Sequence, residues 1–452
     1  MRKPDVIVIG AGIVGAACAH TLANAGQSVL VLDARLGGAT NAGMGHLVVM
    51  DDNPAELAIS QASLTQWHAW APRMAAEAPS TAFTHCGTLW VAADAQEMPE
   101  AEHKRARLHA HGIACELLGA PQLAALEPVL RPGLHGALRV GGDSMVYAPN
   151  AAEWLLGHAS TPIQVENMRV SRIEGRRVHC QDGSVREGGA VLLAAGIHAT
   201  QFCPELPIRP KKGHLAITDR GGAVVRHQLV ELGYVKNAHQ TEGTSVAFNL
   251  QPRPTGQWLL GSSRQFDTLD PAVDNAVLAK MLRRAIEYVP SLAERNAIRT
   301  WTGFRAATPD GLPIIGQHPE HEHLWLAVGH EGLGVTTAPA TASLSGPSTL
   351  CTHTVCAGAR RMKKTATMVE VQVDGTRVRI PVGSSVAAAL AQQPPGRTRL
   401  SVSGQWRAPL CGMGVCHECR VLINGRERLA CQTVCEDGML IATSTAHTGG
   451  AT

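Results

Sequence analysis

A glycine turn between a short apolar strand and a helix constrains this chain more than any other feature. Residues 10–15 read G-x-G-x-x-G; they follow four apolar residues and open a helical stretch that ends near Gly26. Gly10 permits a tight turn, Gly12 lets the backbone approach a pyrophosphate, and Gly15 lets helix and strand pack closely. The helix N-terminus would present free N–H groups to the phosphates. The pattern predicts a Rossmann-type dinucleotide-binding unit.

An acidic residue stands where this interpretation requires one. Asp33 ends the next apolar strand, residues 29–32, and lies 23 positions after Gly10. Its carboxylate is placed to accept hydrogen bonds from ribose hydroxyls. The alternative is a glycine-rich turn without a ligand, which strand, helix and acid together disfavour. The motif by itself does not distinguish FAD from NAD.

Length and composition limit the class of protein. A chain of 452 residues predicts two or three domains, and 45% hydrophobic with 17% charged residues is a globular composition. A net charge of +3 gives no reason to expect nucleic acid as a partner. No apolar run is long enough to span a membrane, and the first residues do not resemble a signal peptide. A cytoplasmic location is expected, with attachment to the inner membrane only through a partner.

The order of patterns along the chain suggests two modules. Apolar strands at 191–195 and 324–328 both precede a glycine, while short strands and a helical stretch at 277–288 suggest an inserted α+β substrate domain. Residues 341–367 begin rich in Ser, Thr, Gly and Pro and then turn basic, which is typical of a linker. Alternation around Asp374-Gly375 then predicts a β-hairpin.

The expected boundaries follow from these patterns. They are an α/β FAD-binding module over 1–340, with substrate-domain segments at about 80–150 and 205–300, a linker over 341–367, and a small module over 368–445.

Three later motifs carry a family resemblance. Residues 191–196, 303–316 and 329–334 resemble, in order, the second dinucleotide-contacting strand, the late motif and the flavin-facing turn of the D-amino-acid, glycine and sarcosine oxidase superfamily. The resemblance covers about residues 5–340 and implies FAD as the cofactor. Residues 43–50 and 261–266 look closest to the catalytic subunits of bacterial D-hydroxyproline dehydrogenases.

The resemblance also implies site residues. In this family the arginine of the late motif, here Arg305, binds the substrate carboxylate, and the alternative is an arginine in a surface ion pair. His214 and Tyr234 are weaker catalytic candidates, because a lone histidine more often has a structural role. The implied FAD contacts are Gly10, Gly12, Ile13, Val14, Gly15, Asp33, Ala34, Gly45, His46, Leu47, Ala195, Gly196, Gly329, Gly332, Leu333 and Gly334.

Clustered cysteines near the C-terminus predict a second cofactor. Cys411, Cys416 and Cys419 have C-x4-C-x2-C spacing, and Cys431 follows as a fourth ligand, which is the plant-type [2Fe-2S] pattern. The alternatives are zinc, which usually needs a second close pair of ligands, and Cys435 in place of Cys431. The module resembles the small ferredoxin-like β-grasp units that accompany hydrogen cyanide synthase, sarcosine oxidase and D-hydroxyproline dehydrogenase, without the Arg and Ser usual in the chloroplast ferredoxin loop.

The two modules together predict a dehydrogenase that oxidises an amino or imino acid and exports the electrons. The favoured substrate is D-hydroxyproline or another D-amino or imino acid. The expected acceptor is a partner flavoprotein subunit or a quinone-linked carrier. Within the class, the alternative is a hydrogen cyanide synthase-like, opine or sarcosine-type component. Outside it, the alternatives are an electron-transfer subunit without its own substrate and an inactive fusion of two reading frames, since residues 345–347 interrupt the last helix.

Overall fold

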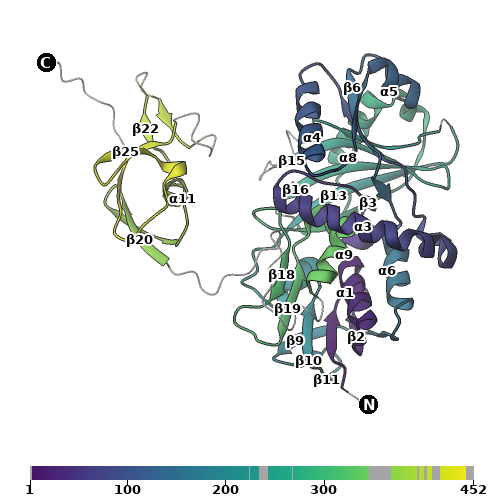
Figure 1. Cartoon of the computed structure of the whole chain (residues 1–452), viewed down its shortest axis with the longest axis horizontal. Coiled ribbons are helices and arrows are strands. Elements are labelled where there is room, and N and C mark those ends of the chain that lie inside the picture. The colour runs from purple at the N-terminus through teal and green to yellow at the C-terminus, as the bar shows by residue number, and fades with distance from the viewer. Residues whose placement is uncertain are drawn as a thin grey trace. The chain divides into compact units, whose positions relative to one another are not determined.

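The chain divides into two compact units, residues 1–362 and 363–452, coloured from purple to green and in yellow in Figure 1. The computed structural model describes residues 3–222, 224–233, 243–266, 268–345, 368–393, 396–401, 405–409 and 418–443. Among these residues, none of the helices has the length and apolar character needed to cross a membrane.

A six-stranded sheet forms the centre of the first unit. Its order is β18-β19-β12-β1-β2-β8, with all neighbours parallel except β18 and β19. The central strands are continuous apolar runs because helices or loops cover both faces. The strands are β1 (Val6–Ile9), β2 (Val29–Asp33), β8 (Gln164–Asn167), β12 (Ala190–Leu193), β18 (Ile314–Gln317) and β19 (Leu324–Val328).

Helices of distant sequence origin pack together on this sheet. The helices α1 (Ile13–Asn24) and α9 (Gly334–Leu344) are neighbours, although their starts are 321 positions apart in the sequence (Figure 1). The long α3 (Pro54–Glu77) lies against α9, and α6 (Ala148–Gly157) lies against α1. A three-stranded sheet, β9 (Val170–Glu174), β10 (Arg177–Cys180) and β11 (Val185–Glu187), completes this part.

An eight-stranded sheet in the same unit has the order β17-β13-β16-β15-β14-β4-β6-β5. Neighbours are antiparallel except β14 and β4, which are parallel. On one face, Phe248 and Leu250 of β15 pack against α8 (Asn275–Tyr288), where the rings of Phe248 and Tyr288 stack. The strands are β4 (Thr88–Ala92), β5 (Glu116–Gly119), β6 (Gly136–Val140), β13 (Arg209–Thr218), β14 (Gln228–Glu231), β15 (Thr244–Pro252), β16 (Trp258–Phe266) and β17 (Ala297–Ala307).

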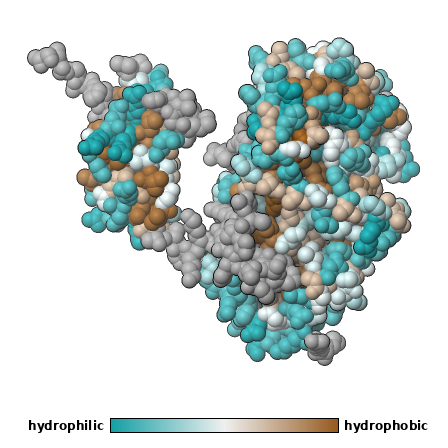
Figure 2. Space-filling model, in the orientation of Figure 1, coloured by the Kyte–Doolittle hydropathy of each residue, from teal (hydrophilic) through white to brown (hydrophobic). Residues whose placement is uncertain are grey.

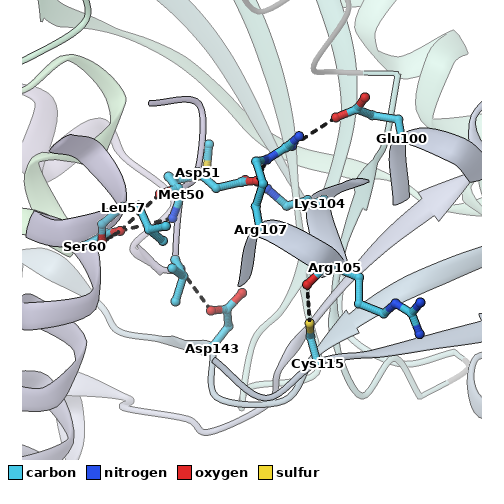
Figure 3. A network of polar contacts seen from close by, with 11 residues as sticks. Met50, Asp51, Leu57, Ser60, Glu100, Lys104, Arg105, Arg107, Cys115 and Asp143 are labelled. Atoms are coloured by element: carbon cyan, nitrogen blue, oxygen red, sulfur yellow. Dashed lines mark hydrogen bonds and ion pairs between the residues drawn. The ribbon is translucent and has the colours of Figure 1, made fainter. Parts of the chain in front are cut away.

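A partly buried ion-pair network joins the segment before α3 to α4 (Met98–Ala110), as Figure 3 shows. The Asp51 carboxylate binds both Lys104 Nζ and, at 2.7 Å, Arg107 Nε. Lys104 is 1% exposed, and its ammonium group lies over the Trp90 ring. Arg107 also reaches Glu100 at 3.1 Å. The network fixes the path of the chain immediately after residues 45–50.

The second unit is built around a five-stranded sheet of order β21-β20-β26-β24-β25. The predicted hairpin is confirmed: β20 and β21 pair antiparallel, and Asp374 and Gly375 both have positive φ. The helix α11 (Val386–Ala391) packs on the sheet to form a separate apolar core. The strands are β20 (Met368–Val373), β21 (Thr376–Pro381), β24 (Arg420–Ile423), β25 (Arg426–Leu429) and β26 (Leu440–Ala442).

Apolar side chains also reach the surface of this second unit, where Figure 2 shows brown areas among the hydrophilic ones. Leu422, Val434 and Leu440 are among the exposed large apolar residues. Two further short strands, β22 (Arg399–Leu400) and β23 (Trp406–Arg407), pair with each other.

Candidate functional site

Four of the motifs predicted to bind the dinucleotide meet at one edge of the six-stranded sheet. Because β2, β1, β12 and β19 run parallel, their carboxyl ends lie on the same edge. Those ends carry the residues that follow each strand: Gly10 after β1, Asp33 at the end of β2, Gly196 after β12 and Gly329 after β19. This edge is where open α/β sheets bind nucleotides.

The glycines of the first turn are required by close backbone contacts. A Cβ atom on Gly10, whose φ is +105°, would lie 2.6 Å from the carbonyl oxygen of Ala194. A Cβ atom on Gly15 would lie 1.9 Å from the carbonyl oxygen of Gly10. The helix therefore approaches β1 and β12 more closely than any other residue type would allow, as the sequence predicted.

Asp33 braces this turn from the neighbouring strand. Its Oδ2 accepts a hydrogen bond from Ala11 N at 2.7 Å, and its Oδ1 accepts one from Arg35 N, also at 2.7 Å. Gly12 has no side chain to cap α1 and no acidic residue lies in the first turn; the neutral Thr40 hydroxyl accepts one hydrogen bond there, from Ile13 N at 3.0 Å. The helix N-terminus thus suits an anionic ligand, which fits the pyrophosphate of a dinucleotide.

A second backbone segment is fixed between the two sheets. Gly45 has φ +83°, and a Cβ atom there would lie 1.8 Å from the carbonyl oxygen of Val146. The carbonyl of His46 accepts a hydrogen bond from Thr336 Oγ1 at 2.9 Å, in the first turn of α9. Trp67 Nε1 donates to the carbonyls of both Val335 and Thr336. The segment with Gly45, His46 and Leu47 is thereby held beside the start of α9, which Leu333 and Gly334 form.

Arg305 lies in a space that a glycine keeps open. It stands on β17 directly opposite Lys211 of β13, so both side chains point to the same face of the sheet. Its Nη1 donates to the carbonyl of Ser263 at 3.1 Å. A Cβ atom on Gly213 would lie 2.7 Å from that Nη1, and one on Gly332 would lie 3.6 Å from Arg305 Cδ. The late motif and the turn at 329–334 therefore meet.

An ion pair that sequence reasoning missed lies at the same place. Buried Lys211 binds Glu331, which has a left-handed φ of 46° between His330 and Gly332. Burial alone would raise the pKa of Glu331, but Lys211, with Arg264 and Arg305 nearby, outweighs that effect and lowers it. Glu331 is accordingly ionised at neutral pH. The available signal was the pair Lys211-Lys212, which lies in a strand whose central residues are buried.

The two weaker catalytic candidates have different outcomes. His214 is fully buried, its Nδ1 bonds to Ser263 Oγ at 2.9 Å, and its Nε2 accepts from Asp274 N at 2.9 Å. Both ring nitrogens are thus used inside the protein, which favours a structural role. Tyr234 lies outside the described residues, and its role stays a prediction.

Two of the four predicted cluster ligands are described. Cys419 and Cys431 bring their Sγ atoms to 3.2 Å without forming a disulfide. Such a pair suits a shared metal centre, since both thiolates can bind one iron. Gln432 Nε2 lies 3.8 Å from Cys431 Sγ and can donate to it. Cys435 is buried in the apolar core of the unit. Cys411 and Cys416 lie outside the described residues.

Comparison with known proteins extends these observations. The chain is 24% identical over 403 residues to the hydrogen cyanide synthase subunit HcnC of Pseudomonas aeruginosa, covering 76% of this chain and 91% of HcnC. It is 26% identical over 368 residues to an opine oxidase subunit of Rhizobium meliloti, covering 74% and 90%. The crystal structure of glycine oxidase from Geobacillus kaustophilus has the same fold, with a TM-score of 0.70 at 22% identity over 79% of this chain and 96% of that one.

Two family models match the two units in turn. Residues 366–446 match a 2Fe-2S iron-sulfur cluster binding domain, which agrees with the close thiols of Cys419 and Cys431. Residues 5–345 match the FAD dependent oxidoreductase (DAO) model, and these residues include every motif at the carboxyl edge of the sheet. The cofactors are therefore FAD and a [2Fe-2S] cluster, and the chain belongs to the DAO family of FAD dependent oxidoreductases.

Proposed function

We propose that this protein is a dehydrogenase that oxidises an amino or imino acid to the imine and sends the electrons through its cluster to a partner. The favoured substrate is D-hydroxyproline or another D-amino or imino acid. One observation carries the proposal: the Arg305 guanidinium lies at the meeting point of β13, β17 and the turn at 329–334. A planar guanidinium in that position can bind a carboxylate through two parallel hydrogen bonds.

The protein residues have distinct tasks in this proposal. When bound, FAD supplies a hydride acceptor and the [2Fe-2S] cluster supplies a one-electron carrier. Arg305 fixes the carboxylate, and with it the position of the α-carbon. Lys211 neutralises Glu331, so that this carboxylate does not repel the anionic end of the substrate. Ser263 links Arg305 to His214, since its carbonyl accepts a hydrogen bond from Arg305 and its hydroxyl contacts the His214 ring.

The names of relatives support the substrate class and the need for a partner. A D-amino acid dehydrogenase of Chromohalobacter salexigens is 28% identical over 251 residues, which cover 52% of this chain and 56% of that protein. HcnC and the opine oxidase protein are both named as subunits. We infer that the second unit is a β-grasp domain and that a partner flavoprotein or quinone-linked carrier takes up the electrons.

Two variants on the same strand test the carboxylate role. Arg305→Leu should lower kcat/KM for a carboxylate substrate by about a hundredfold, since it removes charge-assisted hydrogen bonds of about 3 kcal/mol in total. Arg299→Leu is the matched control, because Arg299 is exposed on β17 and stacks on Trp301. Equal activity in both variants would remove Arg305 from the site.

Anaerobic mixing with a panel of D- and L-amino and imino acids tests the reaction itself. Holoenzyme should lose its flavin absorption band first and its cluster band second with one class of substrate. If both cofactors are present and no compound bleaches either, an electron-transfer subunit without its own substrate becomes the better interpretation.

A further inference from the structure

The face of the eight-stranded sheet opposite α8, called the inner face below, carries a buried polar cluster whose hydrogen bonds are incomplete. On β15, Phe248 and Leu250 point to the apolar core against α8, so Asn249 and Gln251 point to the opposite face. Asn249 is 8% exposed and Gln251 is fully buried. Among the described residues, Oδ1 of Asn249 and Oε1 of Gln251 are buried without a hydrogen-bond partner. His46 completes the group from β3 (His46–Leu47), which pairs with β7 (Ser144–Met145).

One backbone carbonyl determines the orientation of Gln228, and through it the orientation of Gln251 and His46. Gln228 Nε2 donates to the carbonyl of Ser144 at 2.9 Å, and a carbonyl can only accept. The amide oxygen of Gln228 therefore faces the other way, toward His46 Nδ1 and Gln251 Nε2. That oxygen accepts from Gln251 Nε2 at 3.0 Å, and from His46 Nδ1, which must carry the ring proton. The network thus assigns the Nδ1–H tautomer to His46.

The other ring nitrogen of His46 is then left with a lone pair. Within the residues that the structure describes, Nε2 is buried and has no hydrogen-bond partner. Burial lowers the pKa of His46 to about 4, so the ring stays neutral at physiological pH. A buried, unpaired acceptor costs about 1–3 kcal/mol unless a donor reaches it, and this cost is rarely retained without a function.

The backbone of His46 belongs to the predicted FAD-binding segment. Its carbonyl is bonded to Thr336 at the start of α9, and Gly45 before it contacts Val146 closely. The imidazole cannot swing away, since Gln228 is itself bonded to Ser144 and Thr88. His46 is therefore a rigid acceptor, held from both its backbone and its ring.

We propose that Nε2 of His46 accepts a hydrogen bond from an N–H or O–H group of the bound molecules, with the carbonyl oxygens of Gln251 and Asn249 as further acceptors beside it. Two sources supply such a donor: the flavin, through its ring imide or its ribityl hydroxyls, and the substrate, through its amine or a ring hydroxyl. The substrate alternative rests on the proposed function. Because the unpaired buried atoms of His46, Asn249 and Gln251 are acceptors, this part of the site favours a donor-bearing ligand over an apolar one, so it would select hydroxylated imino acids.

The experiment compares holoenzyme carrying His46→Leu, which removes the acceptor, with His46→Gln, which can restore one. The control is His20→Gln, since His20 is also a neutral, enclosed histidine but bonds to the carbonyl of Leu155 within the α1 and α6 packing. Two quantities are measured: the dissociation constant and visible spectrum of FAD, and the concentrations of cis-4-hydroxy-D-proline and D-proline that half-bleach the flavin without oxygen.

Each outcome has a separate meaning. If the donor is on the flavin, His46→Leu weakens FAD binding about tenfold and alters its spectrum, and His46→Gln restores both. If the donor is the substrate hydroxyl, FAD binding is unchanged and only the affinity for cis-4-hydroxy-D-proline falls, by about tenfold. If it is the amine, both substrates lose affinity. The proposal is overturned if His46→Leu behaves like His20→Gln in every measurement. Should no substrate bleach the unmodified protein, the proposed function fails, and the FAD measurements still test His46.

Discussion

At the scale of single residues, buried charged side chains in this protein depend on partners of opposite charge. Asp51 is the clearest case, since one carboxylate holds both Lys104 and Arg107 (Figure 3). Two buried charges that neutralise each other, such as Asp51 and Lys104, add little net stability. Removing one of them leaves the other buried without a counter-charge.

We therefore expect Asp51→Asn to lower the free energy of unfolding of the first unit by about 3–5 kcal/mol. The ammonium group of Lys104 would remain buried at 1% exposure without its counter-charge. Urea denaturation followed by flavin release measures the effect. Glu100→Gln is the control, because its contact with Arg107 is exposed and should contribute less than about 1 kcal/mol. Equal losses in the two variants would contradict this account.

Asp143 predicts a dependence of stability on pH. Burial raises its pKa from 3.8 to about 7, and its Oδ1 accepts from Val49 N. The unfolded chain loses this proton near the ordinary pKa, while the folded chain keeps it up to about 7. Stability is therefore highest below the ordinary pKa and falls as the pH rises toward 7, by at most about 1.4 kcal/mol per unit.

Asp143→Asn should remove that fall. Its gain in stability over the unmodified protein should therefore be larger at pH 7 than at pH 5. Melting temperatures across this range give the test. Asp182→Asn serves as the comparison, because hydrogen bonds from Ser184 lower the pKa of this exposed carboxyl and its contribution is constant above pH 5. An unchanged slope in Asp143→Asn would show that another group controls the pH dependence.

At the scale of elements, close strand contacts position the reactive side chains. Gly213 of β13 faces Gly303 of β17, and the first leaves room for the Arg305 guanidinium. A Cβ atom on Gly213 would meet the flexible end of Arg305 rather than backbone, so the side chain would shift and the fold would remain.

Gly213→Ala should consequently raise KM for the carboxylate substrate about tenfold, with melting temperature and FAD content unchanged. Steady-state kinetics with an artificial electron acceptor provide the measurement. Gly157→Ala is a useful companion, because Gly157 ends α6 and a Cβ atom there would meet open space. An effect on protein yield instead of KM would mean that Gly213 serves folding.

The sequence indicated local elements better than it indicated their pairing. The helix expected at 277–288 is α8, Asn275–Tyr288, because its amphipathic spacing is a local property. The parallel pairing of β14 with β4 joins segments 140 residues apart, and no local pattern encodes it. For the same reason Lys211, Glu331 and Gln228 were missed, since their roles depend on which strands become neighbours. The predicted motifs at 10–15, 191–196 and 329–334 meet at one sheet edge because each ends a strand of the same parallel set.

At the scale of the whole molecule, two units with separate cores carry two kinds of electron carrier. The expected linker over 341–367 lies mostly outside the described residues, and its boundaries stay a prediction. The last helix of the first unit, α9, ends at Leu344, where the sequence interpretation placed its interruption.

Loss of the cluster should divide the reaction into two parts. In Cys431→Ser, a thiol that approaches Cys419 Sγ is removed, while the core of the first unit is untouched. Substrate should still bleach the flavin at its normal rate, but reduction of a one-electron acceptor should fall at least tenfold. Rapid mixing, with the flavin and cluster absorption bands recorded together, checks this prediction. Cys435→Ser, in the core of the same unit, is the control for misfolding. Normal transfer in Cys431→Ser would show that electrons leave the flavin directly.

The alternation along β15 has an evolutionary consequence. Consecutive residues serve opposite purposes, since Phe248 and Leu250 maintain the core and Asn249 and Gln251 line the inner face. Under the proposal above, substitutions at the second pair change what the protein accepts and leave the apolar core intact. A combinatorial library of uncharged polar residues at positions 249 and 251 should yield folded proteins with varied preferences. A library at positions 248 and 250 should yield few folded proteins, because both side chains belong to the apolar core. New specificities in such a scaffold can arise by single steps, each of which leaves the ancestor's architecture intact.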